Sequence, residues 1–170
     1  MRSPTVERRT YRRPLASRAA VDPVTVDPEL VAVLRESQRL GFLGSRPIPA
    51  VIAHARGFVR ALDEFESVAT ILDLGSGGGV PGLVIAHDRP SVHLTLLDRR
   101  AKRTDFLERV VRRLRWQDRV DVVCQDATTF GPDHSFDAVV ARGFGPPAFT
   151  LTTADRLVRP GSPMMISEPP

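Results

Sequence analysis

The sequence predicts an α/β fold, a doubly wound parallel sheet with the strand order 3-2-1-4-5. Three observations support this prediction. Short apolar stretches alternate with helical stretches, a glycine-rich loop follows the first apolar stretch within residues 71–82, and acidic residues stand at the ends of the first three strands. With right-handed crossovers, the carboxyl ends of the strands meet at one edge, so we expect a ligand in the crevice outside strands one and four.

The elements of the sheet follow from apolar runs and from helical spacing. Strands are expected at residues 68–73, 92–97, 120–124, 136–141 and 163–167. Helices are expected between them at residues 82–88, 100–115 and 147–158. Apolar strands that are separated by helices indicate a parallel sheet with both faces covered.

Two further helices are expected before the sheet. The first begins after Asp27, a suitable N-cap that precedes a proline, and runs to Gly41. The second begins at Pro47 or Pro49 and carries apolar residues at helical spacing as far as Leu62. Because both helices precede the glycine-rich loop, we interpret them as its lid.

The length of 170 residues and the hydrophobic content of 42% suffice for one buried core but not for two comfortable domains. We therefore expect a single domain over residues 28–170, with a helical cap at 28–65 and the ligand-binding sheet at 66–170. Residues 1–27 are expected to form a flexible, arginine-rich tail.

The net charge of +4 is distributed unevenly. Residues 1–20 carry six arginines and one glutamate, a net +5, which leaves −1 for residues 21–170. Two interpretations of this tail stay open: a solvated segment, and a segment that binds nucleic-acid phosphates through its arginines.

The lack of long apolar runs and the single cysteine indicate the cellular compartment and limit the possible disulfide and metal chemistry. No apolar run is long enough to span a membrane, and none follows the basic N-terminus to form a signal peptide. We therefore expect a cytoplasmic protein without membrane contact. A single cysteine, Cys124, excludes an internal disulfide and a cysteine-built zinc site, and no metal site is expected. Its place at the end of an apolar strand predicts a buried thiol.

The glycine-rich loop fits two patterns. Residues 77–82 satisfy the Gly-x-Gly-x-x-Gly fingerprint of dinucleotide sites, but this fingerprint starts late after the strand and contains a proline. Residues 73–79 follow the pattern Asp-x-Gly-x-Gly-x-Gly, which resembles class I S-adenosylmethionine-dependent methyltransferases, where the acid binds the ammonium group of the cofactor. A carboxylate at Asp73 repels a pyrophosphate and attracts a cation, which favours the methyltransferase interpretation.

Two further strand ends carry residues that suit an adenosine. Asp98 follows the second strand, 23 residues after Gly75, where an acid can accept both ribose hydroxyls. Asp126 and Ala127 follow the third strand, where the acid can accept from the exocyclic amine of adenine and the Ala127 N–H can donate to a ring nitrogen. Three strand ends in this order indicate an S-adenosyl-L-methionine site.

Longer stretches narrow the resemblance to one family. Residues 73–83 read Asp-Leu-Gly-Ser-Gly-Gly-Gly-Val-Pro-Gly-Leu, residues 97–107 read Leu-Asp-Arg-Arg-Ala-Lys-Arg-Thr-Asp-Phe-Leu, and residues 140–143 read Val-Ala-Arg-Gly. Over about residues 40–168 the chain resembles the family of glucose-inhibited division protein B, the small-subunit ribosomal RNA guanine-N7 methyltransferases. The resemblance implies a Rossmann-like sheet, S-adenosyl-L-methionine as cofactor and ribosomal RNA as partner.

The resemblance also implies roles for individual residues. Arg142 is expected near the methyl donor and the incoming base, as a candidate for positioning, and no other catalytic residue is assigned. Guanine N7 has a free lone pair, so its methylation needs no general base. The expected cofactor-binding residues are Asp73, Gly75, Gly77, Gly79, Val80, Asp98, Asp126, Ala127, Thr128 and Arg142.

Several features depart from the family pattern. Val80 stands where relatives carry Phe or Leu, and Thr128 where they carry Glu. The usual C-terminal hairpin is absent before Pro170, so strand five is expected to form an edge that invites a partner or self-association. Two alternatives stay open: a methyltransferase for a small molecule or a protein, and a non-catalytic S-adenosylmethionine-binding module. The candidate RNA-facing residues are Arg99, Arg100, Lys102, Arg103, Arg113 and Arg115.

Overall fold

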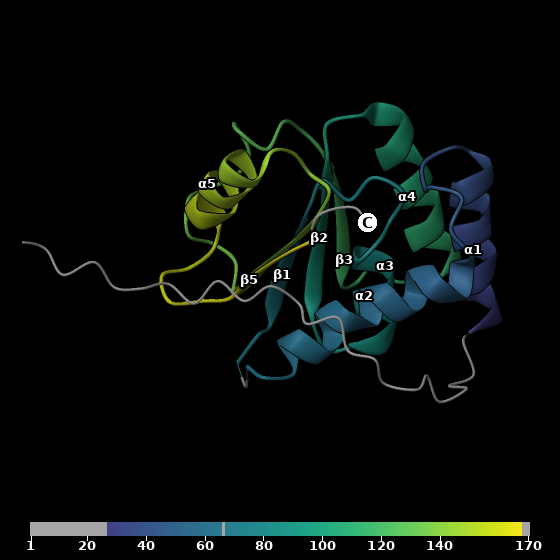
Figure 1. Ribbon diagram of the computed structural model, residues 1–170, viewed down its shortest axis with the longest axis horizontal. Helices are drawn as coiled ribbons and strands as arrows, with labels where there is room; N and C mark the ends of the chain where they lie inside the picture. Colours follow the sequence, from purple (N-terminus) through teal and green to yellow (C-terminus); the bar gives the residue numbers. More distant parts are fainter. Residues whose placement is uncertain (1–26, 66, 168–170) are drawn as a thin grey trace, which may run out of the picture.

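The computed structural model describes residues 27–65 and 67–167, so nearly all of the tail expected at residues 1–27 lies outside the described residues. Within them, five parallel strands form one sheet in the order β3-β2-β1-β4-β5, which confirms the predicted order (Figure 1). The strands are β1 (Thr70–Leu74), β2 (His93–Asp98), β3 (Val120–Cys124), β4 (Ala138–Arg142) and β5 (Met164–Ser167).

The expected helices are also present. They are α1 (Pro28–Arg39), α2 (Ile48–Leu62), α3 (Gly82–Asp88), α4 (Ala101–Arg113) and α5 (Pro147–Leu157). Asp27 caps α1 as expected, because its carboxylate accepts a hydrogen bond of 2.7 Å from the Glu29 N–H. Among the described residues, no helix combines the length and the apolar character that crossing a membrane requires.

Most strands lie one or two residues closer to the C-terminus than the hydrophobic runs indicate. For β1 the cause is Asp137, whose carboxylate accepts hydrogen bonds from the N–H groups of Ala69 at 3.1 Å and Thr70 at 2.8 Å. The pairing of β1 with β4 therefore starts only at Ile71, opposite Ala138.

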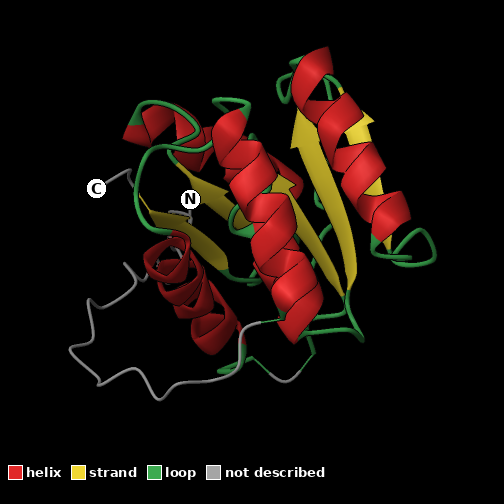
Figure 2. Cartoon of the chain, turned by 90° about the vertical axis from the view of Figure 1, so that its right-hand side faces the viewer, coloured by secondary structure: helices red, strands yellow, loops and turns green. Residues whose placement is uncertain are grey.

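Side chains alternate across the sheet into two hydrophobic clusters. In β1, Ile71 belongs to the cluster that α1, α2, α3 and α4 complete, whereas Leu72 and Leu74 belong to the cluster that α5 completes. In β4 the same alternation separates Val140 from Val139. The first four helices therefore cover one face of the sheet and α5 covers the other (Figure 1), and Figure 2 shows helices in front of the strands.

Cys124 is exposed, so the prediction of a buried thiol is wrong. It ends β3, which is an edge strand with β2 as its neighbour, and the last residues of β3 are only partly buried or exposed. An apolar run at an edge does not guarantee burial, because only one side of the strand is covered by a neighbouring strand.

Candidate functional site

The glycine-rich loop between β1 and α3 folds against the end of β2. The N–H groups of Gly75 and Ser76 both donate to the Leu97 carbonyl at 2.9 Å, and the Gly77 N–H donates to Asp98 Oδ2 at 2.9 Å. Gly75 has a φ of +74°, a left-handed conformation that favours glycine. The loop therefore presents glycine backbone at the carboxyl edge of the sheet.

Asp73, at the end of β1, is only 1% exposed. Its Oδ2 accepts a hydrogen bond of 3.0 Å from the Gly82 N–H, whereas its Oδ1 is buried without a partner in the described structure. Burial raises the pKa of Asp73 to about 7, although the Gly82 hydrogen bond and the Arg142 guanidinium oppose the rise. A buried carboxylate with one unsatisfied oxygen suits the neighbourhood of a cation.

Asp73 gives the free energy of unfolding a specific pH dependence. Its pKa is about 7 in the folded protein and about 3.9 in an unfolded chain, so between these values the folded state keeps a proton that the unfolded state has lost. The resulting stability is fully present below about pH 4 and is lost as the pH rises through 7. Asp73→Asn is expected to remove a slope of about 1.4 kcal/mol per pH unit within this window. Urea unfolding of both proteins between about pH 5 and 7 measures this difference, and equal slopes contradict it.

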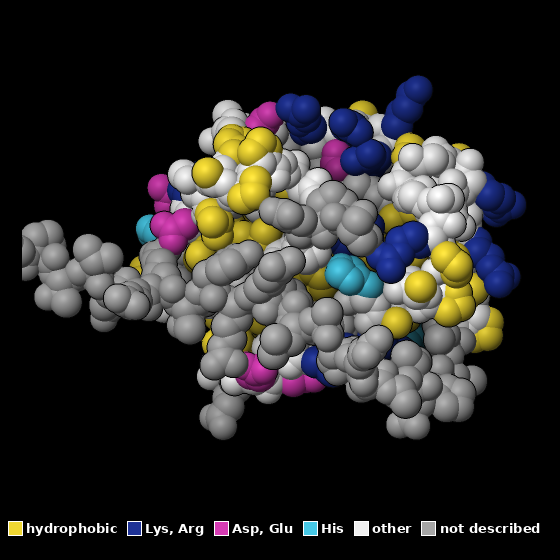
Figure 3. All heavy atoms as spheres, in the orientation of Figure 1, with side chains coloured by type: hydrophobic (Ala, Val, Ile, Leu, Met, Phe, Trp, Pro, Cys, Tyr) yellow, Lys and Arg dark blue, Asp and Glu magenta, His cyan; other side chains and the backbone are white. Residues whose placement is uncertain are grey.

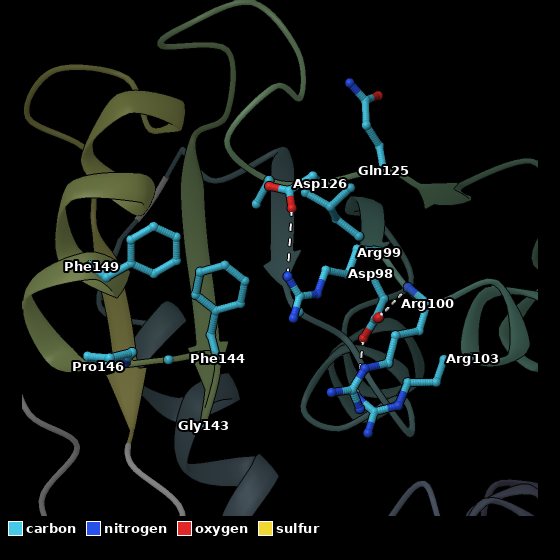
Figure 4. Close-up of a pocket in the computed structure, with 14 residues that line it drawn as sticks. Asp98, Arg99, Arg100, Arg103, Gln125, Asp126, Gly143, Phe144, Pro146 and Phe149 are labelled. Carbon is cyan, nitrogen blue, oxygen red and sulfur yellow. Dashed lines mark hydrogen bonds and ion pairs between the residues drawn. The ribbon is translucent and has the colours of Figure 1, made fainter.

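A cavity of about 440 Å³ opens at the carboxyl edge of the sheet. The ends of β1, β2 and β3 line one side of it, and the segment between β4 and α5, with the first turn of α5, lines the other (Figure 4). Its size is typical of small-molecule sites. The sheet brings four of the expected residues to its wall, namely Gly75, Asp98, Asp126 and Ala127.

Asp98 is 6% exposed and is held at both carboxylate oxygens. Oδ1 accepts from the Arg100 N–H at 2.9 Å, and Oδ2 accepts from the Gly77 N–H at 2.9 Å. The Arg103 guanidinium lies 3.5 Å from Oδ2. Because each carboxylate oxygen has a second lone pair, Asp98 can hold the glycine loop and still accept from a ligand hydroxyl.

Asp126 and Thr128 form a local turn after β3. Thr128 donates its N–H at 2.9 Å and its hydroxyl at 2.7 Å to Asp126 Oδ1, and these hydrogen bonds lower the pKa of Asp126. Thr128 does not line the cavity, whereas the buried Ala127 does. The Arg156 guanidinium donates to the Ala127 carbonyl at 2.7 Å and so fixes this stretch of backbone.

Arg142 ends β4 and contacts the glycine loop without lining the cavity. Its Nε donates to the Val80 carbonyl at 3.2 Å. Burial lowers the pKa of Arg142, and the charge of Arg46 lowers it further, while Asp73 raises it in part. The neighbouring His54 also has a lowered pKa, first because of burial and then because of these two arginines. The other expected residues that do not line the cavity are Asp73, Gly77, Gly79 and Val80.

The segment between β4 and α5 and the first turn of α5 supply cavity residues that the sequence did not assign. Phe144, together with Gly143, Gly145 and Pro146, lines the cavity from the segment, and Phe149 lines it from α5. The available signal was the position of this stretch after β4, the strand at which the order of the sheet reverses. Three residues considered only for RNA, Arg99, Arg100 and Arg103, also line the cavity.

The last turn of α1 and the turn that follows it support the glycine loop from outside the cavity. Ser37 is fully buried and donates its hydroxyl to the Gly78 carbonyl at 2.8 Å. A Cβ on Gly78 would lie 2.7 Å from both Leu43 Cγ and the Phe42 carbonyl oxygen. No described residue of α1 or α2 lines the cavity, so in this structure the end of α1 and the following turn brace the loop, and a lid formed by the two helices stays a prediction.

Ser37→Ala is expected to lower the free energy of unfolding by about 1–2 kcal/mol, because it leaves the buried Gly78 carbonyl without its donor. The matched control is Thr152→Ala, which removes an exposed hydroxyl from α5 and is expected to change stability by less than about 0.5 kcal/mol. Urea unfolding compares the two variants. If both are as stable as the wild type, Ser37 does not brace the loop.

The sheet order and the fold place the chain in the class of Rossmann-like methyltransferase folds. The solved structure of the SAM-dependent methyltransferase from Thiobacillus denitrificans in complex with S-adenosyl-L-homocysteine aligns with a TM-score of 0.59 and 22% identity, over 79% of this chain and 54% of that chain. At this identity the likeness shows the fold alone. In the described residues, no group of three or more His, Cys, Asp or Glu is arranged to hold a metal ion.

Residues 32–167 match the family described as rRNA small subunit methyltransferase G (GidB), and the chain belongs to this family. The ribosomal RNA small subunit methyltransferase G of Laribacter hongkongensis is 43% identical over 74 residues, which are 44% of this chain and 35% of that protein. The protein of the same name from a Nocardioides species is 36% identical over 121 residues, which are 71% of this chain and 48% of that protein. The chain therefore spans about half the length of these relatives or less.

Proposed function

We propose that this chain binds S-adenosyl-L-methionine in the cavity and methylates N7 of a guanine in small-subunit ribosomal RNA. One observation carries the proposal: Asp98 ends β2, Asp126 follows the adjacent β3, and both line a single cavity with Gly75. These groups match an adenosine, since Asp98 can accept from the ribose diol while Asp126 and the Ala127 N–H address the adenine edge.

The residues around the glycine loop fit this cofactor better than a dinucleotide. Asp73 places a buried carboxylate, with an unpaired Oδ1, under the loop. That charge opposes a pyrophosphate and favours the ammonium group of a methionine moiety. The loop also leaves no room for side chains, because a Cβ on Gly75 would lie 2.6 Å from the Phe144 ring.

Methylation of guanine N7 requires no proton transfer by the protein. S-adenosylmethionine supplies an electrophilic methyl group on its sulfonium. Guanine N7 presents a lone pair that carries no proton, so the chain contributes orientation, charge and exclusion of water. We assign Arg142 to positioning, because it joins the end of β4 to the glycine loop through Val80.

Membership of the rRNA small subunit methyltransferase G family supports ribosomal RNA as the partner. Basic side chains next to the cavity provide a surface for its phosphates. We define this α4 basic surface as Arg99, Arg100, Lys102, Arg103, Arg113 and Arg115, and Figure 3 shows Lys and Arg side chains gathered over the region of α4 and α1. Arg99 and Arg100 also line the cavity, so the basic surface is continuous with it.

Two experiments test the two halves of this proposal. Calorimetry with S-adenosylhomocysteine is expected to show saturable binding at one site, and its absence contradicts the cofactor assignment. N7-methylguanine in ribosomal RNA, mapped in cells with and without the gene, is expected to decrease in the deletion strain. Unchanged methylation would favour the small-molecule or protein acceptor, and binding without any turnover would favour the non-catalytic module.

The remaining proposals concern location and assembly. A ribosomal RNA substrate is consistent with a cytoplasmic location. β5 lies at an edge of the described sheet, so pairing with a partner or a second copy stays a prediction. Light scattering of the purified chain tests self-association at this edge.

A further inference from the structure

Two phenylalanine rings line the cavity on the side of β4. Phe144 and Phe149 stack with their ring centroids 5.6 Å apart and their planes 13° apart, a geometry typical of offset aromatic pairs. In contrast, Asp98 is the last residue of β2 and Asp126 follows β3. Figure 4 shows the two rings on one side of the cavity and the two acids on the other. The aromatic pair therefore lies apart from the groups that suit an adenosine.

Glycines on both sides bring the backbone against this aromatic pair. A Cβ on Gly75 would lie 2.6 Å from Phe144 Cδ2, so the Phe144 ring rests directly on the glycine loop. A Cβ on Gly145 would lie 3.3 Å from Phe149 Cδ1. Close contacts with the backbone at Gly75 and Gly145 therefore fix the positions of the two rings in the cavity.

The outer ring of the pair remains open to a ligand. Phe144 is half-buried against the α5 cluster, but Phe149 is 45% exposed, although it lines a cavity. Binding is stabilised when the flat face of a ligand covers an exposed phenyl ring inside a cavity, because apolar surface is then removed from water. Purines are such ligands, and base–aromatic stacking is a common mode of RNA recognition.

We propose that the Phe144–Phe149 pair is the stacking platform for the guanine that accepts the methyl group. This inference rests on the proposed function. The order β3-β2-β1-β4-β5 separates the adenosine-binding acids of β2 and β3 from the rings that follow β4, so cofactor and base occupy opposite ends of one cavity. The Arg99 guanidinium, which is exposed and lies 3.9 Å from Asp126, belongs to the adenosine side of the same cavity.

The test replaces the exposed ring and retains the rest of the site. Phe149→Ala removes the ring, Phe149→Leu keeps apolar bulk without an aromatic face, and Phe149→Trp enlarges the face. The matched control is Phe65→Ala, because Phe65 is 36% exposed and lies between α2 and β1, away from the cavity. The first measurement is saturation-transfer NMR with guanosine 5′-monophosphate on protein saturated with S-adenosylhomocysteine. The second is the KM for unmethylated small-subunit ribosomal RNA.

The platform predicts saturation transfer to the guanine H8 proton in the wild type, in Phe149→Trp and in Phe65→Ala, and its loss in Phe149→Ala and Phe149→Leu. It also predicts a rise of about 5- to 150-fold in the KM for RNA in Phe149→Ala, with an unchanged affinity for S-adenosylhomocysteine. Equal KM values for Phe149→Ala and the wild type overturn the platform. A loss of cofactor affinity instead assigns the rings to the adenine and also overturns it. A wild-type protein that transfers no methyl group to RNA overturns the proposed function, and the platform with it.

Discussion

Asp98→Ala is expected to lower the affinity for S-adenosylhomocysteine by about 100-fold or more, because two hydrogen bonds from the ribose diol to a carboxylate are lost at about 1.5–3 kcal/mol each. The same side chain also holds the N–H groups of Gly77 and Arg100 at 2.9 Å. Its removal therefore frees the glycine loop from the end of β2. Isothermal calorimetry measures the affinity.

Two further variants separate these effects. Asp98→Asn keeps one acceptor oxygen for the loop while it removes the charge, so it is expected to fold more stably than Asp98→Ala and still bind cofactor weakly. Asp121→Ala removes an exposed carboxylate from β3 that pairs with His93 at 2.8 Å, and it is expected to leave the affinity unchanged. Wild-type affinity in Asp98→Ala contradicts the assignment of this cavity to the cofactor.

Gly82→Ala is expected to destabilise the protein by roughly 3–5 kcal/mol through overpacking and the loss of a buried hydrogen bond. A Cβ on Gly82 would lie 2.4 Å from both Asp73 Oδ2 and Leu96 Cδ2. Both atoms are buried, and the first accepts the Gly82 N–H, so neither can move without loss. Urea unfolding measures the change in the free energy of unfolding.

The same substitution in α2 is expected to have the opposite sign. Gly57 lies inside the helix, and a Cβ there would lie 3.9 Å from the Arg60 guanidinium at the end of a flexible side chain. Gly57→Ala should therefore raise the free energy of unfolding by about 0.5–1 kcal/mol, through helix propensity and reduced freedom of the unfolded chain. If Gly82→Ala and Gly57→Ala change the free energy of unfolding equally, the close contact of Gly82 with Asp73 does not explain why glycine is needed at position 82.

The strands, their order and the positions of two acidic residues depend on local pattern and could be predicted from the sequence. The hydrophobic runs gave the strands, and the handedness of crossovers gave their order. Because parallel strands end at one edge, Asp98 and Asp126 could be expected in one site although 28 positions separate them. The family could be predicted as well, since the stretch after β1 carries a specific run of glycines and a proline.

Contacts that depend on the path of the backbone could not be predicted. The Asp73 carboxylate accepts a hydrogen bond from the N–H of Gly82, nine residues later, because the loop turns back over the end of the strand. Ser37 reaches Gly78 across 41 residues, which no local spacing encodes. The stacking of Phe144 on Phe149 depends on a turn that glycines shape, so helical periodicity does not reveal it.

The most direct test identifies the nucleoside that the protein methylates. The protein is incubated with unmethylated small-subunit ribosomal RNA and S-adenosylmethionine that carries a deuterated methyl group, and the RNA is digested and its nucleosides are analysed by mass spectrometry. We predict deuterated 7-methylguanosine with the wild-type protein, and a yield lower by about 100-fold with Asp98→Ala when the cofactor is subsaturating. The absence of labelled 7-methylguanosine, or label in a different nucleoside, would contradict the proposed function.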